Sequence, residues 1–302
     1  MEYALQSIGR SYDEFLTAAR WAESKGLAAF AIPDHYVYSV SGPDSPAYDA
    51  FAIMAGLARE TSTIELSITV APVTFRHPAV LAKNAATIQE MAGGRFTLGV
   101  GTGWLEAEHV SFGIPFPDTS TRFEMTEEAL GYLRAAFSDP PRRFKGRYYT
   151  LEAFNMLPRP ELRLVVGGTG RVRTPRLAGA YADEFNAFPD KPDVFAAKVA
   201  RARSTAEAAG RDPDALLVSS SGQMIAADTE AGYWELLAEI AAKADTDPET
   251  IEQAAAKRNA PRGTWEQVRA IIGGMEEQGV TRFYIQGPFD AGGLELKLGK
   301  LM

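Results

Sequence analysis

Short apolar runs alternate along this chain with longer segments in which apolar residues recur at helical spacing. Eight such runs are rich in β-branched, aromatic and small residues, as strands are, and they alternate with helical segments. The strands are expected at residues 3–7, 29–33, 64–71, 96–101, 162–167, 184–187, 216–226 and 282–286. Strands and helices that alternate in this way build a parallel sheet, and eight units favour closure into a (β/α)8 TIM barrel.

Several expected helices begin or end at residues that stabilise helix termini. Ser11 and Glu14 form a Ser-x-x-Glu capping box, and Gly26 is a suitable stop for the helix that follows. Thr264 caps the last helix of the repeat. The other helices are expected at residues 49–59, 78–91, 122–137, 173–182 and 192–209, and the last at residues 264–278.

Two segments do not follow the repeat. Residues 142–159, rich in aromatic and basic side chains, are expected to form a short hairpin or loop after the fourth strand. Residues 230–262, rich in Ala and Glu, are expected to form one or two extra helices after the seventh strand, beside the mouth of the barrel. No linker divides the chain, so residues 1–302 are predicted to be a single barrel domain with these two insertions.

Composition narrows the possible functions. The chain has 46% hydrophobic and 23% charged residues, as a globular protein with a full core has. Its formal net charge is -8 and it has no long run of Lys or Arg, so a surface for nucleic acid or an anionic membrane is not expected. The absence of cysteine excludes disulfides and thiolate sites, and the 3 scattered histidines argue against a bound metal. Neither a signal peptide nor about 18 consecutive apolar residues are found, so a cytosolic protein is expected.

Glycine is concentrated where the fourth and fifth strands end. The two exits read Gly101-Thr102-Gly103-Trp104 and Gly167-Gly168-Thr169-Gly170. In a barrel these exits lie side by side on the C-terminal face, where backbone N–H groups can approach a phosphate or a flat ring without a Cβ in the way. We interpret the pair as a phosphate cradle, and two tight turns required by packing are the alternative. The first run does not match the dinucleotide-binding Gly-x-Gly-x-x-Gly motif.

A titratable pair follows the second strand. Asp34 and His35 emerge from a buried strand onto the same C-terminal face. His35 can hold a proton near neutral pH, and Asp34 can set its orientation or charge. We therefore interpret His35 and Asp34 as catalytic residues. The alternative is that Asp34 caps a turn and His35 is merely exposed.

Further residues are expected at the rim of this face. Arg76 and His77 follow the third strand, and for His77 a structural role is as plausible as a ligand contact. Trp104 is expected either in the core or wall, or stacked on a bound ring. Glu106 and Glu108 fit the ordinary enrichment of acids at a helix N-terminus.

Several short motifs, spread over nearly the whole chain, together match the pattern of a known family. They are Asp34-His35, Phe75-Arg76-His77-Pro78, Ala82-Lys83, Thr87, the run from Gly94 to Trp104, Glu108, Gly113-Ile114-Pro115, Arg122, Gly167-Gly168 and Ala182-Asp183. Together they closely resemble the bacterial luciferase-like family of flavin-dependent oxidoreductases. The run Gly-Arg-x-x-Leu-Gly-Val-Gly-x-Gly-Trp is most similar to the branch of that family that uses the deazaflavin coenzyme F-420.

The resemblance implies a luciferase-like barrel whose cofactor ring lies across the C-terminal face. It also implies a bulged third strand with a non-proline cis peptide near Thr69-Val70. The cofactor-binding residues that it implies are Thr69, Val70, Gly101, Thr102, Gly103, Trp104, Gly167, Gly168, Thr169 and Gly170. A histidine that matches His35 often serves such enzymes as acid, base or cofactor contact. The deazaflavin-dependent sugar-phosphate dehydrogenases have a glutamate where this chain has Trp104, which argues against sugar-phosphate chemistry.

Three functions are compatible with this pattern. The first is hydride transfer between coenzyme F-420 and a small organic substrate, with His35 handling a proton. The second is a monooxygenase that uses reduced FMN supplied by a separate reductase. The third is a non-catalytic flavin-binding barrel, against which the Asp34-His35 pair and the two glycine loops argue.

The resemblance also implies a homodimer. Tyr36, Tyr38 and Phe51 suggest a partly aromatic substrate pocket. The variable loops at the barrel mouth do not identify the substrate.

Overall fold

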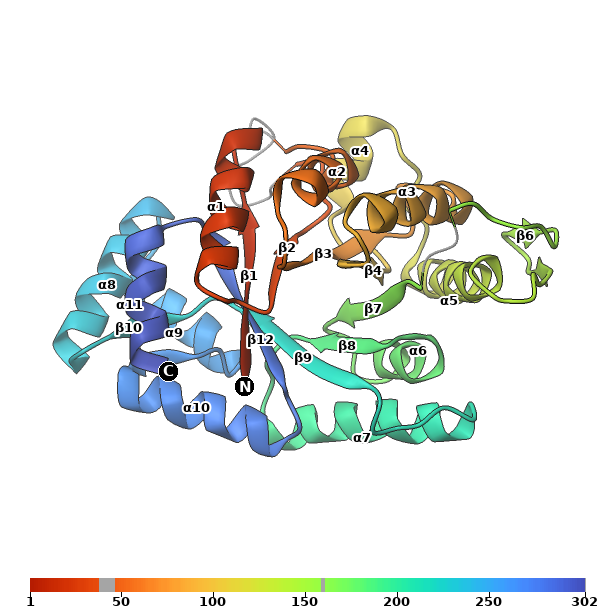
Figure 1. The fold of residues 1–302 in the computed structure, drawn as a ribbon. Helices are drawn as coiled ribbons and strands as arrows, with labels where there is room; N and C mark the ends of the chain where they lie inside the picture. Colours follow the sequence, from red (N-terminus) through yellow and green to blue (C-terminus); the bar gives the residue numbers. More distant parts are fainter. Residues whose placement is uncertain (38–46, 159–160, 302) are drawn as a thin grey trace.

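The fold is a closed barrel of eight parallel strands, as predicted (Figure 1). The computed structural model describes residues 1–37, 47–158 and 161–301. Around the barrel the strands follow the order β1-β12-β9-β8-β7-β4-β3-β2, so strands that follow one another in the chain are neighbours. Their bounds are β1 (Glu2–Ile8), β2 (Ala29–Ile32), β3 (Glu65–Pro72), β4 (Phe96–Gly101), β7 (Arg163–Gly168), β8 (Glu184–Ala187), β9 (Leu217–Gly222) and β12 (Arg282–Pro288).

Helices cover the outside of the barrel, and every predicted helix is present. The bounds are α1 (Tyr12–Ser24), α2 (Ala50–Glu60), α3 (Pro78–Met91), α4 (Glu106–Phe112), α5 (Thr119–Ala136), α6 (Arg173–Tyr181), α7 (Pro192–Ala208), α8 (Glu230–Lys243), α9 (Pro248–Lys257), α10 (Trp265–Glu277) and α11 (Ala291–Leu301). Among the helices of the described residues, none is both long and apolar enough to cross a membrane.

The predicted caps are found with one change of partner. Thr264 and Gln267 form a complete capping box at the start of α10. At α1 the Ser11 hydroxyl accepts from the backbone N–H of Glu14, as predicted, but the Glu14 carboxylate accepts from Arg10 instead of from Ser11. The Glu14 carboxylate therefore binds the backbone N–H one residue before the one that it binds in a standard capping box.

Both predicted insertions are present. After β4 and α5 the chain forms an antiparallel hairpin of β5 (Phe144–Lys145) and β6 (Thr150–Leu151). After β9 it forms β10 (Ile225–Ala227), α8, α9 and β11 (Arg262–Thr264). The prediction of one strand over residues 216–226 was wrong, because β9 ends at Gly222 and β10 leaves the barrel to pair with β11. Ile225 instead packs with Tyr233 and Leu237 of α8 in a small separate core.

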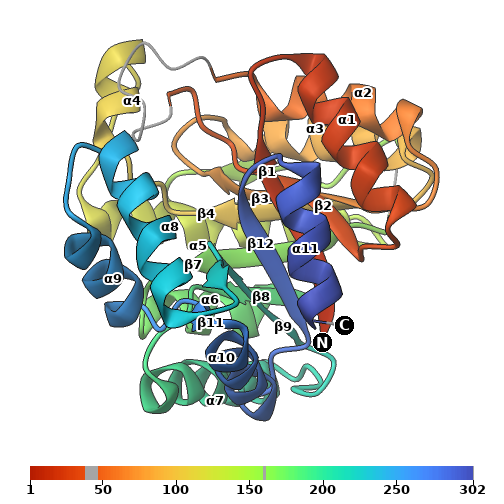
Figure 2. The same ribbon diagram turned by 90° about the vertical axis from the view of Figure 1, so that its left-hand side faces the viewer.

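Two helices were not predicted, α4 and α11. The short α4 follows Leu105, whose side chain makes no capping hydrogen bond within the described chain. Glycines at positions 292, 293 and 299 interrupt the apolar pattern of α11 and lower its helix propensity. Both views show α11 ending beside the start of β1, so it completes the helical layer where the barrel closes (Figures 1 and 2).

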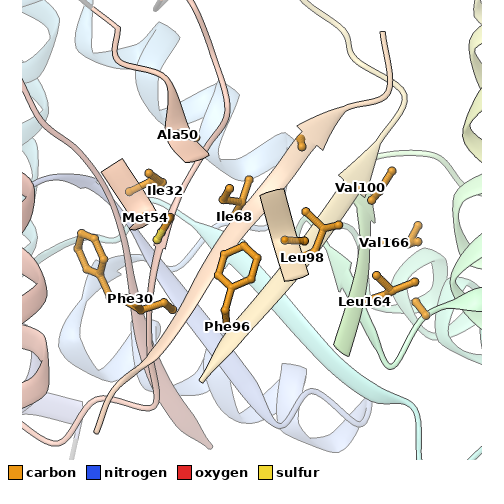
Figure 3. Packing of buried hydrophobic residues seen from close by; sticks show 14 of the residues in the cluster. Phe30, Ile32, Ala50, Met54, Ile68, Phe96, Leu98, Val100, Leu164 and Val166 are labelled. Carbon is orange, nitrogen blue, oxygen red and sulfur yellow. The ribbon is translucent and has the colours of Figure 1, made fainter. Parts of the chain in front are cut away.

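The main apolar core lies between the strands and the helices. Outward-facing residues of β2, β3, β4 and β7 pack against α2 and its neighbours, and Figure 3 shows part of this layer. Its labelled members are Phe30, Ile32, Ala50, Met54, Ile68, Phe96, Leu98, Val100, Leu164 and Val166. Because side chains of a strand alternate between its two faces, the residues between these positions point into the barrel.

The inside of the barrel is polar. Arg282 on β12 donates to Glu65 on β3, and Gln6 on β1 donates to the backbone carbonyl of Thr69 on β3. Neither pair of strands is adjacent in the sheet, so these bonds cross the interior. Charged residues thus fill the N-terminal end of the barrel, and amides, hydroxyls and glycines line the end that faces the candidate site.

Candidate functional site

His35 lies at the C-terminal end of β2, and a buried glutamate holds its ring. Its Nδ1 lies 3.1 and 3.2 Å from the two carboxylate oxygens of Glu108 on α4. The same carboxylate accepts from the backbone N–H of Tyr36 at 2.9 Å. Glu108 is fully buried, whereas His35 is partly exposed. Glu108 lies in the first turn of α4, as expected of an acid at a helix start, but its burial and its contact with His35 were not predicted.

Asp34 is buried next to His35 but serves a different partner. Both of its oxygens accept from the guanidinium of Arg76, which also pairs with Asp49 at the start of α2. The carboxylate that contacts and orients the His35 ring is therefore that of Glu108 and not that of Asp34. Burial raises the pKa of Asp34 to about 6, although Arg76 opposes the shift. Arg76 instead joins the loop after β2 to the loop after β3.

A layer of rings continues from this ion pair toward α4. Arg76 lies 4.6 Å from the ring centroid of Phe51 and 5.6 Å from that of Tyr36. Tyr36 is stacked on Phe75 with ring centroids 4.4 Å apart. Tyr36 is thus partly buried beside the candidate site, Phe51 belongs to the main core, and Tyr38 lies outside the described residues.

Trp104 stands at the rim and not in the core. Its side chain is 67% exposed, and its edge meets the His35 ring with centroids 5.9 Å apart. His109 on α4 is fully buried, and its Nε2 lies 2.7 Å from the hydroxyl of Thr74 and its Nδ1 2.8 Å from the Leu105 carbonyl oxygen. Glu108 and His109 thus attach α4 to the barrel, and most of its other residues are exposed.

The third strand is bulged at the predicted place. Its register against β4 shifts between Ile68 and Ala71, and the Thr69-Val70 peptide is cis, as expected. A Cβ added at Gly101 would lie 2.6 Å from Val70 Cγ2, and one at Gly167 would lie 2.9 Å from Val70 Cγ1. These two glycines therefore make room for the Val70 side chain, which agrees with the packing alternative for these exits.

Two glutamines hold the backbone of the bulge from below. Gln286 on β12 donates to the Gln6 side chain at 2.8 Å, and Gln6 donates to the Thr69 carbonyl at 2.6 Å. The hydroxyl of Thr69 lies 2.8 Å from that of Ser67. The position of Thr69 and Val70 is consequently fixed by β1 and β12 as well as by β4 and β7.

The two glycine-rich exits are neighbours, as predicted. β4 pairs with β7, and a Cβ at Gly101 would lie 3.7 Å from the Gly167 carbonyl oxygen. Gly103 has a φ of 74° and Gly168 a φ of 150°, so both turns need glycine. Thr102 is partly exposed and Thr169 is exposed, which leaves both on the surface of this face.

The fifth barrel strand leads into a helix with an open N-terminus. Val172 occupies the N-cap position of α6, and no side chain of the described residues caps it. The segment around this start has Arg171, Arg173 and Arg176 and no acid in the first turn. Gly170 packs against the Thr174 side chain, which is buried at the same place. An open helix start with nearby cations is a suitable site for a phosphate.

The comparison with protein families agrees with this geometry. The family model described as luciferase-like monooxygenase matches residues 3–282. The chain belongs to this family. The resemblance seen in the motifs is thereby confirmed, as is the expectation of an enzyme.

The curated relatives of this luciferase-like chain include proteins named pyrimidine monooxygenase. Pyrimidine monooxygenase RutA of Cronobacter sakazakii is 34% identical over 170 residues, which cover 54% of this chain and 50% of the relative. The chain spans about half the length of the curated relatives that it matches, including RutA of Escherichia coli.

Solved structures share the fold of this luciferase-like chain at low identity. An F-420-dependent secondary alcohol dehydrogenase has a TM-score of 0.80 at 21% identity and covers 100% of this chain and 99% of its own. The EDTA monooxygenase of a Chelativorans species has a TM-score of 0.82 at 20% identity, with coverage of 100% and 92%. Both likenesses concern the fold alone.

His77 has a structural role, which was one of the two alternatives for this residue; the other was a ligand contact. Its Nδ1 accepts from the backbone N–H of Ala79 at 3.1 Å and so caps α3, and its ring meets Tyr132 and Tyr149. Within the described residues, no group of three or more metal-ligating side chains could hold a metal ion. Of the three histidines, His35 is the one whose ring contacts a carboxylate at the candidate site.

Proposed function

We propose that this luciferase-like protein transfers a hydride between the deazaflavin coenzyme F-420 and a small organic substrate. The observation that carries the proposal is the His35–Glu108 pair at the C-terminal face of the barrel, 3.1 Å apart and beside Trp104. Interconversion of an alcohol and a carbonyl moves a proton as well as a hydride. A histidine attached to a carboxylate is suited to that proton step.

The residues of this face fit a cofactor with a flat ring and a phosphate. The bulge at Thr69-Val70 offers a fixed apolar surface, because Gln6 and the glycines at positions 101 and 167 define where it lies. The open start of α6, with Arg171 and Arg173 near it, supports an anion. We therefore assign the ring to the Val70 side of the face and the phosphate to residues 168–174.

When bound, the deazaflavin supplies the hydride chemistry and little reactivity toward oxygen. His35 takes the substrate hydroxyl proton as the substrate carbon loses its hydride, or returns it in the reverse direction. Trp104 and Tyr36 restrict water around the ring of His35 and contact apolar parts of the substrate. Val70 would contact the ring of the cofactor.

A second candidate function is favoured by the relatives in sequence. The matched half of the chain is similar to proteins named pyrimidine monooxygenases, with 34% identity over 170 residues. A luciferase-like monooxygenase would receive reduced FMN from a separate reductase and would form product only with oxygen. The same surfaces, Val70 and the start of α6, would hold FMN.

One binding comparison separates these functions. The purified protein is titrated with oxidised F-420 and with FMN, and quenching of the fluorescence of each ring is followed. Micromolar or tighter binding of F-420, with FMN at least about tenfold weaker, supports deazaflavin chemistry; each tenfold is about 1.4 kcal/mol of binding. Preference for FMN, with oxygen-dependent turnover of reduced FMN, supports the monooxygenase instead. Binding without turnover on any panel of alcohols, carbonyls or pyrimidines would leave a non-catalytic barrel.

The role of His35 is tested in whichever reaction is found. His35→Asn is expected to lower kcat by about 100-fold or more with little change in cofactor affinity, as loss of a general acid–base group does. His77→Asn is the matched control, because that histidine caps α3. Full activity of the His35 variant would contradict the proposed proton step.

A further inference from the structure

Glu108 is placed so that it determines the state of His35. Its carboxylate is fully buried, although five of the seven residues of α4 are exposed, so its burial is specific to this contact. It meets both the ring of His35 and the backbone N–H of Tyr36, and therefore fixes the ring relative to the main chain that carries it. It also lies in the first turn of α4, where the helix dipole favours a negative charge.

From these contacts we infer that Glu108 is a positioning residue, which holds neutral His35 as the Nδ1–H tautomer. An ionised carboxylate can only accept hydrogen bonds, so the Nδ1 beside it must carry the hydrogen. The lone pair of the neutral ring then lies on Nε2. This inference rests on the proposed function, in which that lone pair takes the substrate proton.

The other charges around His35 do not replace Glu108. Asp34, which precedes His35 in the chain, gives both oxygens to Arg76, and Arg76 is shared with Asp49. Trp104 contacts the ring with its edge. Among these side chains, Glu108 is the one that binds Nδ1, so its substitution should change the tautomer while the Asp34–Arg76 pair stays intact.

The test reads the tautomer directly in the apoprotein. The chain has 3 histidines, so the protein labelled with nitrogen-15 at histidine gives a simple spectrum that His77→Asn and His35→Asn variants assign. Above the titration of the rings, the wild-type His35 signals are expected to show a protonated Nδ1 and an unprotonated Nε2. Wild-type signals of the opposite tautomer would overturn the inference without any variant at Glu108.

Two variants complete the test. Glu108→Gln keeps the shape of the side chain but offers an N–H₂ group, and we expect it to shift His35 toward the Nε2–H tautomer. Glu106→Gln, an exposed acid on the same helix, is the matched control and should leave the spectrum unchanged. An unchanged His35 spectrum in folded Glu108→Gln would contradict the inference.

Turnover then distinguishes this inference from the proposed function. Glu108→Gln is expected to lower kcat by about tenfold or more, as loss of a group that orients a catalytic histidine does. In the His35→Asn background the same change should cost nothing further, because the two residues act as a unit. If the tautomer shifts as expected but His35→Asn remains fully active, the positioning contact stands and the proposed proton step fails.

Discussion

At the scale of single residues, burial and charge act against each other at Asp34. The carboxylate is fully buried, which raises its pKa to about 6, while Arg76 lowers it. At neutral pH the group is therefore ionised and paired with Arg76. As the pH falls toward 4, the folded protein takes up a proton earlier than the unfolded chain does, since an unfolded Asp has a pKa of about 3.9.

This gives a prediction with a definite sign. Because the folded pKa is raised, Asp34 contributes stability that is present below pH 4 and is lost as the pH rises through about 6. The free energy of unfolding of wild type minus that of Asp34→Asn should therefore increase by up to about 3 kcal/mol as the pH falls from 7 to 4. Urea unfolding of both proteins at each pH measures the difference, and other carboxylates cancel in the subtraction. A difference independent of pH would mean that folding does not raise the pKa of Asp34.

A second prediction at the scale of single residues concerns the close approach of Gly101 to Val70. A Cβ at position 101 would lie 2.6 Å from Val70 Cγ2, too close for an unchanged bulge. Gly101→Ala should therefore cost about 1 to 3 kcal/mol of stability, as overpacking does, and weaken cofactor binding. Val70→Ala in the same chain should restore part of both. If Gly101→Ala is as stable as wild type and binds the cofactor equally well, the glycine is not required by Val70.

The sequence predicted much of this site, and its failures have a physical cause. His35, the Thr69-Val70 bulge and the adjacent glycine exits follow from positions at strand ends, which a barrel brings to one face. Glu108 was missed because its partner is 73 residues away, and a glutamate near a helix start is usually exposed.

At the scale of elements, α10 combines a strong start with a weak middle. Thr264 and Gln267 form a complete capping box, yet Gly273 and Gly274 lie within the helix. Apart from the adjoining backbone of the helix and the neighbouring residues, no described atom lies within 4 Å of a Cβ added at either position. Glycine lowers helix stability relative to alanine by about 0.5 to 1 kcal/mol. Alanine at position 273 therefore fits the available space.

The expected outcomes at α10 have opposite signs. Gly273→Ala should raise the free energy of unfolding by about 0.5 to 1 kcal/mol. Thr264→Ala should lower it by about 1 kcal/mol through loss of the cap. Thermal and urea unfolding followed by circular dichroism measure both changes. A loss of stability in Gly273→Ala would show that the helix packs more closely than the structure indicates.

The sequence predicted the helices that have a regular apolar spacing or a cap, and it did not predict the helices that depend on contacts with distant parts of the chain. The seven helices of the repeat have regular apolar spacing or caps, and all seven are present. By contrast, α4 is attached to the barrel by Glu108 and His109, and α11 contains three glycines. The segment 216–226 divides because Ile225 enters a second core under α8, and no local pattern in that segment indicates the change.

At the scale of the whole molecule, the barrel interior divides into a charged end and an uncharged polar end. The charged end contains Arg282 and Arg163 with the acids Glu2, Glu65 and Glu184, which come from β1, β3, β7, β8 and β12. The other end consists of Gln6, Gln286 and the glycines beneath Val70. Within the barrel interior, the charged side chains thus lie at the end opposite the candidate site.

Arg282 is the centre of the charged end, because it contacts acids from three other strands. It donates to Glu2 at 3.0 Å and to Glu65 at 2.8 Å, and its Nη1 lies 3.5 Å from Glu184. Burial raises the pKa of Glu184, and its Oε2 has no hydrogen-bond partner among the described residues. The two acids inside the barrel therefore depend on Arg282 and Arg163 for their compensation.

Removal of the cation and removal of one acid should consequently differ in cost. Arg282→Met leaves buried carboxylates short of a partner and should lower the free energy of unfolding by about 3 to 5 kcal/mol at pH 7. Glu184→Gln keeps an oxygen that accepts from Ser219 and Tyr284, so it should cost less than about 1 kcal/mol.

The combination of both changes tests the compensation itself. In the double variant one buried negative charge is absent, so its loss of stability should be clearly smaller than that of Arg282→Met alone. Urea unfolding of the four proteins forms a double-mutant cycle. Additive losses would mean that Arg282 stabilises the barrel by packing, and the coupling between β12 and β8 would then not depend on charge.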